Sequence, residues 1–151
     1  MSGETDLIKL YSARILELAS DIPHHGRLEA PDATVKRRAP LCGSTVTVDI
    51  KTDGRAITDY AAEVKACALG QAAASVVGAN IIGCTLDQVT SARNALNAML
   101  KQDGSVPAAP FDGLEVLLPA REYKNRHASI MLTLEAATEA LESAQSSSSC
   151  A

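Results

Sequence analysis

Two cysteines flank the part of the chain with the clearest β-hairpin pattern. Cys42 lies in Pro40-Leu41-Cys42-Gly43, where Pro and Gly make an exposed turn before the first strand. Cys67 lies where the return strand meets a helix, and the positive N-terminus of that helix favours a thiolate. Because antiparallel strands place the start of one beside the end of the other, we expect both thiols at one end of a sheet.

Two neighbouring thiolates are ligands that soft metal ions prefer, whereas a free cysteine also serves as a small buried apolar side chain. Spacing alone leaves both interpretations open. His127, at the start of the last predicted helix, offers an imidazole as a third ligand or is a polar surface residue. His24 and His25 lack helical spacing and are expected on the surface. Cys84 fits a role in core packing, and Cys150 lies in the tail.

The hairpin that would position the cysteines is predicted from the alternation of polar and apolar residues. Residues 44–50 run Ser, Thr, Val, Thr, Val, Asp, Ile, which is typical of a strand buried on one side. Asp53 and Gly54 then supply a tight turn. A return strand over residues 56–65 follows, with Ile57 and Val64 among its apolar positions. We therefore predict an antiparallel sheet.

Helical spacing of apolar residues predicts the elements around the hairpin. Residues 7–22 carry apolar side chains every three or four positions, which places them on one helix face. An Ala-rich helix over 67–82 should be buried on most sides. Thr85 with Gln88 forms the capping-box pattern that opens a third helix, and residues 127–141 predict the last one. The other segments are expected to be irregular over 24–40, a loop over 103–110 and a short strand over 114–118.

The bulk composition fits one compact domain. The chain has 151 residues, of which 46% are apolar, so we expect a domain over residues 1–142 and a disordered Ser-rich tail over 143–151. The net charge of -4 and the pI near 5.3 argue against nucleic-acid binding, which needs clustered Lys and Arg. The basic run at Lys36, Arg37 and Arg38 is either a solvated face or a docking point for a partner. With no signal peptide or membrane-spanning stretch in view, we expect a cytoplasmic protein.

The segments around both cysteines resemble those of a known family. Pro40-Leu41-Cys42-Gly43 is followed by Lys65-Ala66-Cys67-Ala68 and then by an Ala/Ser-rich helix. With these motifs the chain, from about residue 7 to residue 141, is similar to the IscU and NifU-type iron-sulfur cluster assembly scaffolds. The resemblance implies an α+β fold with a small antiparallel three-stranded sheet packed against about four to five helices (IscU/SufE-like).

The resemblance also implies a ligand set from which two members are absent. In that family three cysteines and an aspartate hold a transient cluster or a zinc ion, and a cysteine desulfurase delivers the sulfur. Here His127 is kept, but Ala128 stands at the position of the third cysteine and Ser44 at that of the aspartate. Cys42, Cys67 and His127 remain as metal and cofactor ligands. A [2Fe-2S] cluster usually takes four protein ligands, so this set is one short.

The function that the resemblance implies is a scaffold-like binding protein and not an enzyme. It would bind iron, a labile iron-sulfur cluster or zinc through Cys42 and Cys67, with a cysteine desulfurase or other cluster-assembly proteins as partners. The alternative is a metal-free adaptor or accessory subunit of a larger complex, which Ala128 and Ser44 favour. A catalytic role for Cys42 as a sulfur-accepting nucleophile would need an activating base that the sequence does not reveal.

Overall fold

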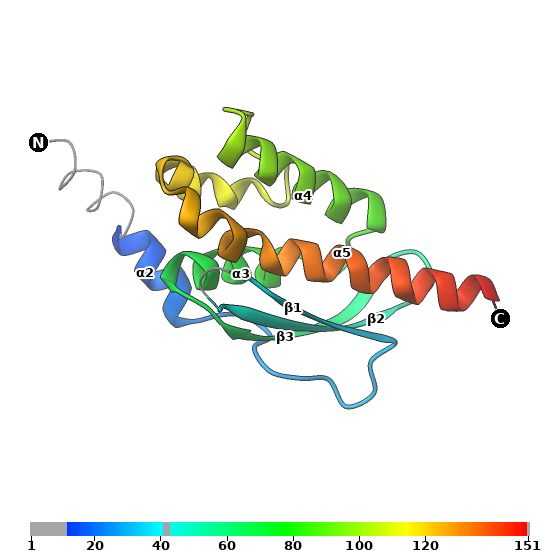
Figure 1. Cartoon of the computed structure of the whole chain (residues 1–151). Helices are drawn as coiled ribbons and strands as arrows, with labels where there is room; N and C mark the ends of the chain where they lie inside the picture. Colours follow the sequence, from blue (N-terminus) through cyan, green and yellow to red (C-terminus); the bar gives the residue numbers. More distant parts are fainter. Residues whose placement is uncertain (1–11, 41–42, 151) are drawn as a thin grey trace, which may run out of the picture.

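The chain folds as a three-stranded antiparallel sheet with helices on one face (Figure 1). The structure, a computed structural model, describes residues 12–40 and 43–150. Its elements in chain order are α2 (Ala13–Ser20), β1 (Ala33–Arg38), β2 (Thr45–Thr52), β3 (Ile57–Lys65), α3 (Ala68–Asn80), α4 (Leu86–Lys101), the 3-10 helices η1 (Asp112–Glu122) and η2 (Lys124–Arg126), and α5 (His127–Cys150). This architecture confirms the predicted α+β class.

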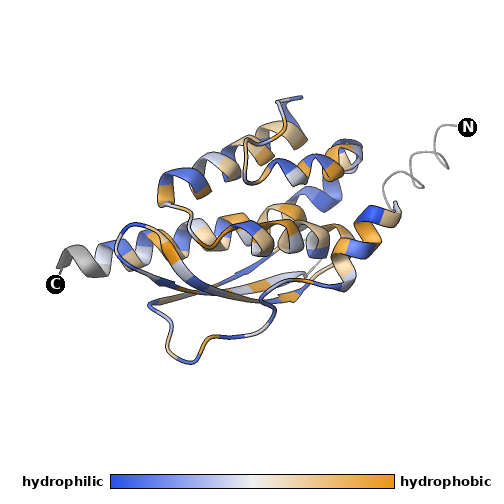
Figure 2. Ribbon diagram, turned by 180° about the vertical axis from the view of Figure 1, so that it is seen from behind, coloured by the Kyte–Doolittle hydropathy of each residue, from blue (hydrophilic) through white to orange (hydrophobic). Residues whose placement is uncertain are grey.

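The predicted hairpin forms the central strand and one edge strand of the sheet. β2 pairs antiparallel with β3, and the strands lie in the order β1-β2-β3. Val46, Val48 and Ile50 alternate along β2 and are at most 1% exposed, because this face packs against α5. Figure 2 shows hydrophobic residues alternating with hydrophilic ones along the strands and helices, as one-sided burial requires.

The expectation of an irregular segment over residues 24–40 is wrong for its last part, where β1 forms. β1 pairs with the free edge of β2 in a register that sets Val35 opposite Val48. The strand is mostly exposed, so its sequence has little apolar alternation to reveal it. Arg37 on β1 forms ion pairs with Glu135 and Glu139 of α5 at 3.8 and 2.9 Å. The pairing partners therefore hold β1 in place more than its own apolar content does.

The helices form two layers above the sheet (Figure 1). α3 and α5 contact the sheet and each other, and α4 packs against α5 on the outside. Alanines that are at most 1% exposed line the packed faces of α3 and α5, namely Ala72, Ala73, Ala74, Ala136, Ala137 and Ala140. Small side chains let helix backbones approach closely, which agrees with a core that holds few aromatic residues.

Two further expectations about local structure have different outcomes. The capping box that opens α4 is confirmed, since the Thr85 hydroxyl accepts from the Gln88 N–H and the Gln88 side chain accepts from the Thr85 N–H. The short strand over 114–118 is wrong, because these residues lie in η1. Leu114, Leu117 and Ala120 are the buried residues of η1, and their spacing of three matches the three-residue turn of a 3-10 helix.

The first and last helices of the structure, α2 and α5, have other bounds than the predicted helices. α2 covers Ala13–Ser20, and the earlier part of the predicted helix over 7–22 lies outside the described residues. The Ser-rich segment 143–151, expected to be disordered, is helical through Cys150 as the end of α5. Ala144 in this segment is 3% exposed, so its first part packs against the core.

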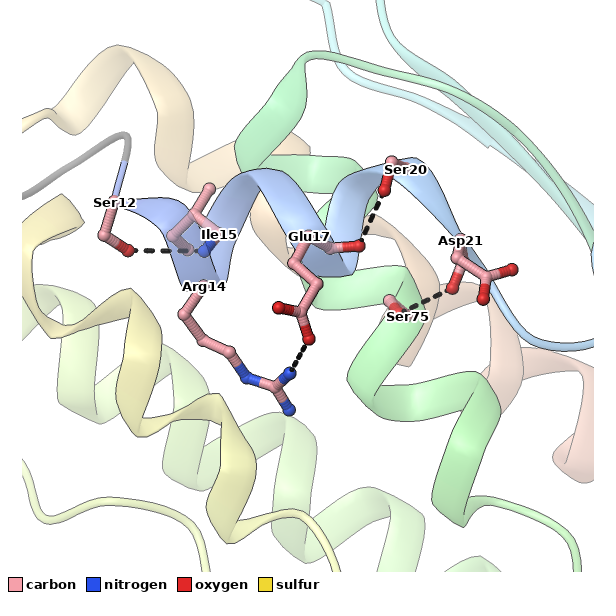
Figure 3. A network of polar contacts seen from close by, with 7 residues as sticks. All are labelled: Ser12, Arg14, Ile15, Glu17, Ser20, Asp21 and Ser75. Atoms are coloured by element: carbon pink, nitrogen blue, oxygen red, sulfur yellow. Dashed lines mark hydrogen bonds and ion pairs between the residues drawn. The ribbon is translucent and has the colours of Figure 1, made fainter.

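α2 packs against α3, and a few polar contacts define its two ends (Figure 3). The Ser12 hydroxyl accepts from the Ile15 N–H at 3.3 Å and caps the helix. Arg14 and Glu17 form an exposed ion pair at 2.8 Å. At the other end of α2 the Ser75 hydroxyl on α3 donates to the Asp21 carbonyl oxygen. Between these two ends, the Ile15 side chain is fully buried in the hydrophobic core.

The segment between α2 and β1 covers the far side of the sheet and one of its edges. Ala62 of β3 exchanges backbone hydrogen bonds with His24 and Gly26, so this edge is paired. Further along, the Arg27 side chain and the Leu28 N–H reach the Asp49 carboxylate of β2, and the Thr34 hydroxyl donates to it at 2.6 Å. Asp49 is fully buried and joins this segment to two strands.

The buried Tyr60 hydroxyl leads to a stability prediction. Tyr60 of β3 is 1% exposed, and its hydroxyl has no hydrogen-bond partner among the described residues. Because a buried unsatisfied hydroxyl costs free energy, we expect Tyr60→Phe to leave the free energy of unfolding unchanged or to raise it by about 1 kcal/mol. Urea denaturation followed by circular dichroism measures this. A loss of more than about 1 kcal/mol would mean that the hydroxyl has a partner.

Candidate metal site

The hairpin register places the two cysteine-bearing segments at one end of the sheet. Thr45, at the start of β2, is paired with Lys65, at the end of β3. Gly43 and Ser44 precede Thr45, and Ala66 and Cys67 follow Lys65. Cys42 itself lies outside the described residues. The structure thus confirms the antiparallel geometry on which the expected convergence of the thiols depends.

The turn beside Cys42 requires a glycine. Gly43 has φ +74°, in the left-handed region that residues with a side chain adopt at a cost. Its N–H donates to the Ala39 carbonyl oxygen at 2.9 Å, and the Ala39 N–H donates to the Ser44 carbonyl oxygen. These two backbone bonds close the turn that joins β1 to β2.

Cys67 is the N-cap residue of α3. Its side chain makes no capping hydrogen bond, so the sulfur is not committed to the helix backbone. The residue is partly exposed, which leaves the thiol accessible from solvent. Cys67 therefore combines a position at the helix start with a thiol that solvent can reach.

The Cys67 sulfur contacts a buried serine hydroxyl, which in turn contacts a second one. The Ser129 Oγ of α5 lies 3.5 Å from the Cys67 Sγ and donates to the Ser44 Oγ at 3.1 Å. Ser129 is 1% exposed and Ser44 is 6% exposed. Sequence reasoning missed Ser129, because its contact with Cys67 depends on how α5 packs against α3. The three side chains form one connected polar group at the end of the sheet.

The residue that packs against the Ser129 hydroxyl is a glycine, Gly70. Gly70 lies in the first turn of α3, and a Cβ at this position would stand 2.5 Å from the Ser129 Oγ and 2.9 Å from the Ala66 Cβ. Either distance is too short for an ordinary contact. Gly70 thus provides the space in which the Ser129 hydroxyl lies beside Cys67.

The candidate ligand His127 begins α5 and is 4% exposed, so it is not the surface residue that was the other expectation. Its Nε2 lies 2.9 Å from the Ala120 carbonyl oxygen. Since a carbonyl oxygen only accepts, Nε2 carries the proton and Nδ1 keeps its lone pair in the neutral ring. That tautomer leaves one nitrogen able to act as a metal ligand.

The remaining cysteine and histidine positions behave as packing or surface groups. Cys84 is 3% exposed and its thiol donates to the Asn80 carbonyl oxygen, and burial raises its pKa, as expected for a core cysteine. His24 and His25 are exposed, as predicted. Ala128 is partly buried against the core. Across residues 12–40 and 43–150, the structure contains no group of three or more His, Cys, Asp or Glu side chains placed to hold a metal.

Fold and site together define a small α+β domain that presents a cysteine at the end of a hairpin, beside the N-terminus of a buried helix. Residues 10–126 match the model of the NifU-like N-terminal domain. The chain therefore belongs to this family of NifU- and IscU-like iron-sulfur cluster assembly scaffolds, which are scaffold proteins and not catalysts. This confirms the resemblance that the cysteine motifs indicate.

Individual relatives agree with this assignment. The iron-sulfur cluster assembly scaffold protein IscU of Streptococcus pyogenes is 23% identical over 132 residues, which are 87% of this chain and 82% of that protein. The crystal structure of the N-terminal part of a nitrogen-fixing NifU-like protein from Brucella abortus is 44% identical, with a TM-score of 0.90 over 93% of this chain and 98% of that one. A scaffold structure for the SUF system from Fervidobacterium islandicum, at 23% identity, shares the fold with a TM-score of 0.78 over 89% of this chain and 98% of that one.

Among the described residues, no helix is both long enough and apolar enough to span a membrane.

Proposed function

We propose that this chain binds iron, a labile iron-sulfur cluster or zinc through Cys42 and Cys67. The observation that carries the proposal is the pairing of Thr45 with Lys65, which brings the segments next to both cysteines to one end of the sheet. Membership of the scaffold family supports an iron-sulfur cargo. The sulfur of Cys67, which makes no capping bond to α3 and is partly exposed, supports a role as ligand.

His127 is the proposed third ligand, through Nδ1. The hydrogen bond from Nε2 to the Ala120 carbonyl oxygen fixes the ring orientation, as the outer partner of a ligating histidine commonly does. Three ligands hold zinc or iron with a position open to an outside ligand. They also suit a weakly held cluster that is passed on to other proteins. A cysteine desulfurase or other cluster-assembly proteins are the partners that this function requires.

The second candidate is a metal-free adaptor or accessory subunit that keeps the scaffold fold. Ala128 and Ser44 favour it, since they stand where the family has a thiolate and a carboxylate. In this case Cys67 and Ser44 serve packing, and the end of the sheet contacts a larger complex. Metal content separates the two candidates, because an adaptor needs no metal.

Elemental analysis of protein isolated without oxygen tests the proposal. We expect about one iron or zinc per chain or fewer, and we expect Cys42→Ser or Cys67→Ser to lower this content by about tenfold or more, because each variant removes one thiolate. Cys150→Ser is the matched control, since it removes a thiol remote from the hairpin in sequence, and it should keep the wild-type content. A wild-type protein free of iron and zinc would support the adaptor.

A further inference from the structure

The outer edge of β1 is open to a further strand. β1 pairs with β2 on one side, and among the described residues no strand pairs with its other side. The Ala39 N–H, just after β1, donates to the Ser44 carbonyl oxygen, and the residues whose backbone faces the partner alternate along an antiparallel strand. The backbone groups that face outward are therefore those of Thr34, Lys36 and Arg38.

Two basic side chains lie on one face of this edge. Arg37 points toward α5, where it pairs with Glu135 and Glu139. Because side chains alternate along a strand, Lys36 and Arg38 point to the opposite face of the sheet. Both are exposed, and neither has an ion pair within the described part of the chain. They are two residues apart, which is about 7 Å along the strand.

We propose that the outer edge of β1 docks an extended acidic segment of a partner protein, which adds to the sheet as a further strand. This inference goes beyond the proposed function and does not depend on a bound metal. The outward backbone groups supply the hydrogen bonds, and carboxylates at alternate positions of the segment face Lys36 and Arg38. The chain as a whole carries a net charge of -4, so it is this local basic pair that attracts an acidic partner.

The other face of the same edge determines which charge pattern the partner needs. Residues of the added strand that lie between its carboxylates point toward α5, where the Glu135 and Glu139 side chains are 34% and 52% exposed. A carboxylate there meets like charges, which is unfavourable. Val35 on this face packs against the core, so a neutral side chain fits beside it. The expected ligand alternates acidic and neutral residues.

Fluorescence polarisation with two labelled peptides tests this charge pattern on the full-length protein. One peptide alternates aspartate with threonine, a neutral residue that favours strands, and the other has the same residues in one acidic and one neutral block. We expect the alternating peptide to bind about tenfold more tightly, and its binding to weaken with added NaCl because exposed charges are screened. Equal affinities would mean charge attraction alone and would overturn the added strand.

Hydrogen exchange of the backbone amides, followed by NMR, identifies the edge itself. With the alternating peptide at about ten times its dissociation constant, exchange at Lys36 and Arg38 should slow about tenfold. The amides of Val35 and Arg37, which already face β2, should change little. No slowing at Lys36 and Arg38 would contradict the proposal. Slowing that needs no peptide and increases with protein concentration would identify a second copy as the occupant, which also overturns it.

Two substitutions at one position separate the backbone contribution from the charge. Lys36→Gln removes the charge and should weaken binding of the alternating peptide about threefold. Lys36→Pro also removes the outward N–H, which an edge strand tolerates, and should weaken binding more than about tenfold. Lys101→Gln, at the exposed end of α4, is the matched control for loss of one positive charge and should bind like the wild type. Equal binding by the two Lys36 variants would exclude pairing through the backbone.

Discussion

The double variant Ser44→Asp/Ala128→Cys is expected to bind Zn²⁺ or Fe²⁺ about 100-fold more tightly than the wild type. It introduces a carboxylate and a thiolate at the two positions where the resemblance implies ligands, and each charged ligand should contribute about tenfold or more. Ala128 directly follows His127 and is partly buried, so a cysteine side chain fits without entering the deep core. A competition titration with a chromophoric chelator measures the affinity.

The same variant carries an internal check on folding. Ser44 is 6% exposed, so an aspartate there buries a charge, which costs free energy in the metal-free protein. We expect the metal-free variant to melt below the wild type and the metal-bound variant to melt above it, because a ligand that binds the folded state stabilises it. Ser44→Asp/Ala128→Ser is the control that keeps the new charge but lacks the thiolate, and it should gain less affinity. Equal affinities for wild type and double variant would contradict the ligand assignment.

The second large effect concerns stability, where Asp49→Ala is expected to lower the free energy of unfolding by about 2–4 kcal/mol. The fully buried carboxylate accepts hydrogen bonds from Arg27, the Leu28 N–H and Thr34. Its removal leaves the Leu28 N–H and the Thr34 hydroxyl without their acceptor. The Arg27 side chain is half exposed, so water compensates part of the loss. Chemical denaturation measures the change.

Asp32→Ala is the matched control for this variant. The Asp32 carboxylate accepts from the Thr52 N–H at an exposed position, so its loss should cost less than about 1 kcal/mol. Asp49→Asn should fall between the two, because the amide keeps the shape but loses the charge that Arg27 pairs with. A change of less than about 1 kcal/mol in Asp49→Ala would contradict the role of this carboxylate as an anchor.

Acid stability gives a further readout of Asp49. Burial alone would raise the pKa of this carboxyl, but the hydrogen bonds from Arg27, Thr34 and Leu28 outweigh burial and hold the pKa below its ordinary value. The stabilisation is complete above the ordinary aspartate pKa of about 3.9 and is lost as the pH falls through the lower pKa of the folded state. Asp49→Asn should therefore lose less stability than the wild type between about pH 4 and pH 2.

The sequence predicts the elements whose local signals agree with their tertiary surroundings. The alternation over 44–50 corresponds to a strand whose apolar residues face α5, and Thr85 with Gln88 predicts the start of α4 because a capping box is a local structure. β1 is missed because its stability comes from pairing with β2 and from the Arg37 ion pairs. η1 is mistaken for a strand because a spacing of three over so few residues gives a weak signal.

The residues of the candidate site show the same contrast between local sequence signals and tertiary packing. Cys42 and Cys67 are proposed from the sequence because they flank a hairpin, and hairpin geometry follows from local alternation. Ser129 lies 62 residues from Cys67 and 85 residues from Ser44, and no local pattern indicates that the three side chains meet. Their contact is a product of the packing of α5 against α3, which only the folded chain reveals.

The outer edge of β1 bears on how the protein behaves in crowded solution. Within the part of the chain that the structure describes, β3 has its free edge paired with residues 24–26, whereas no strand pairs with the outer side of β1. The strand carries exposed Lys36 and Arg38 on either side of Arg37, whose charge is paired with Glu135 and Glu139. Two copies that met through this strand would bring the lysines and arginines of both together, which disfavours strand-to-strand aggregation.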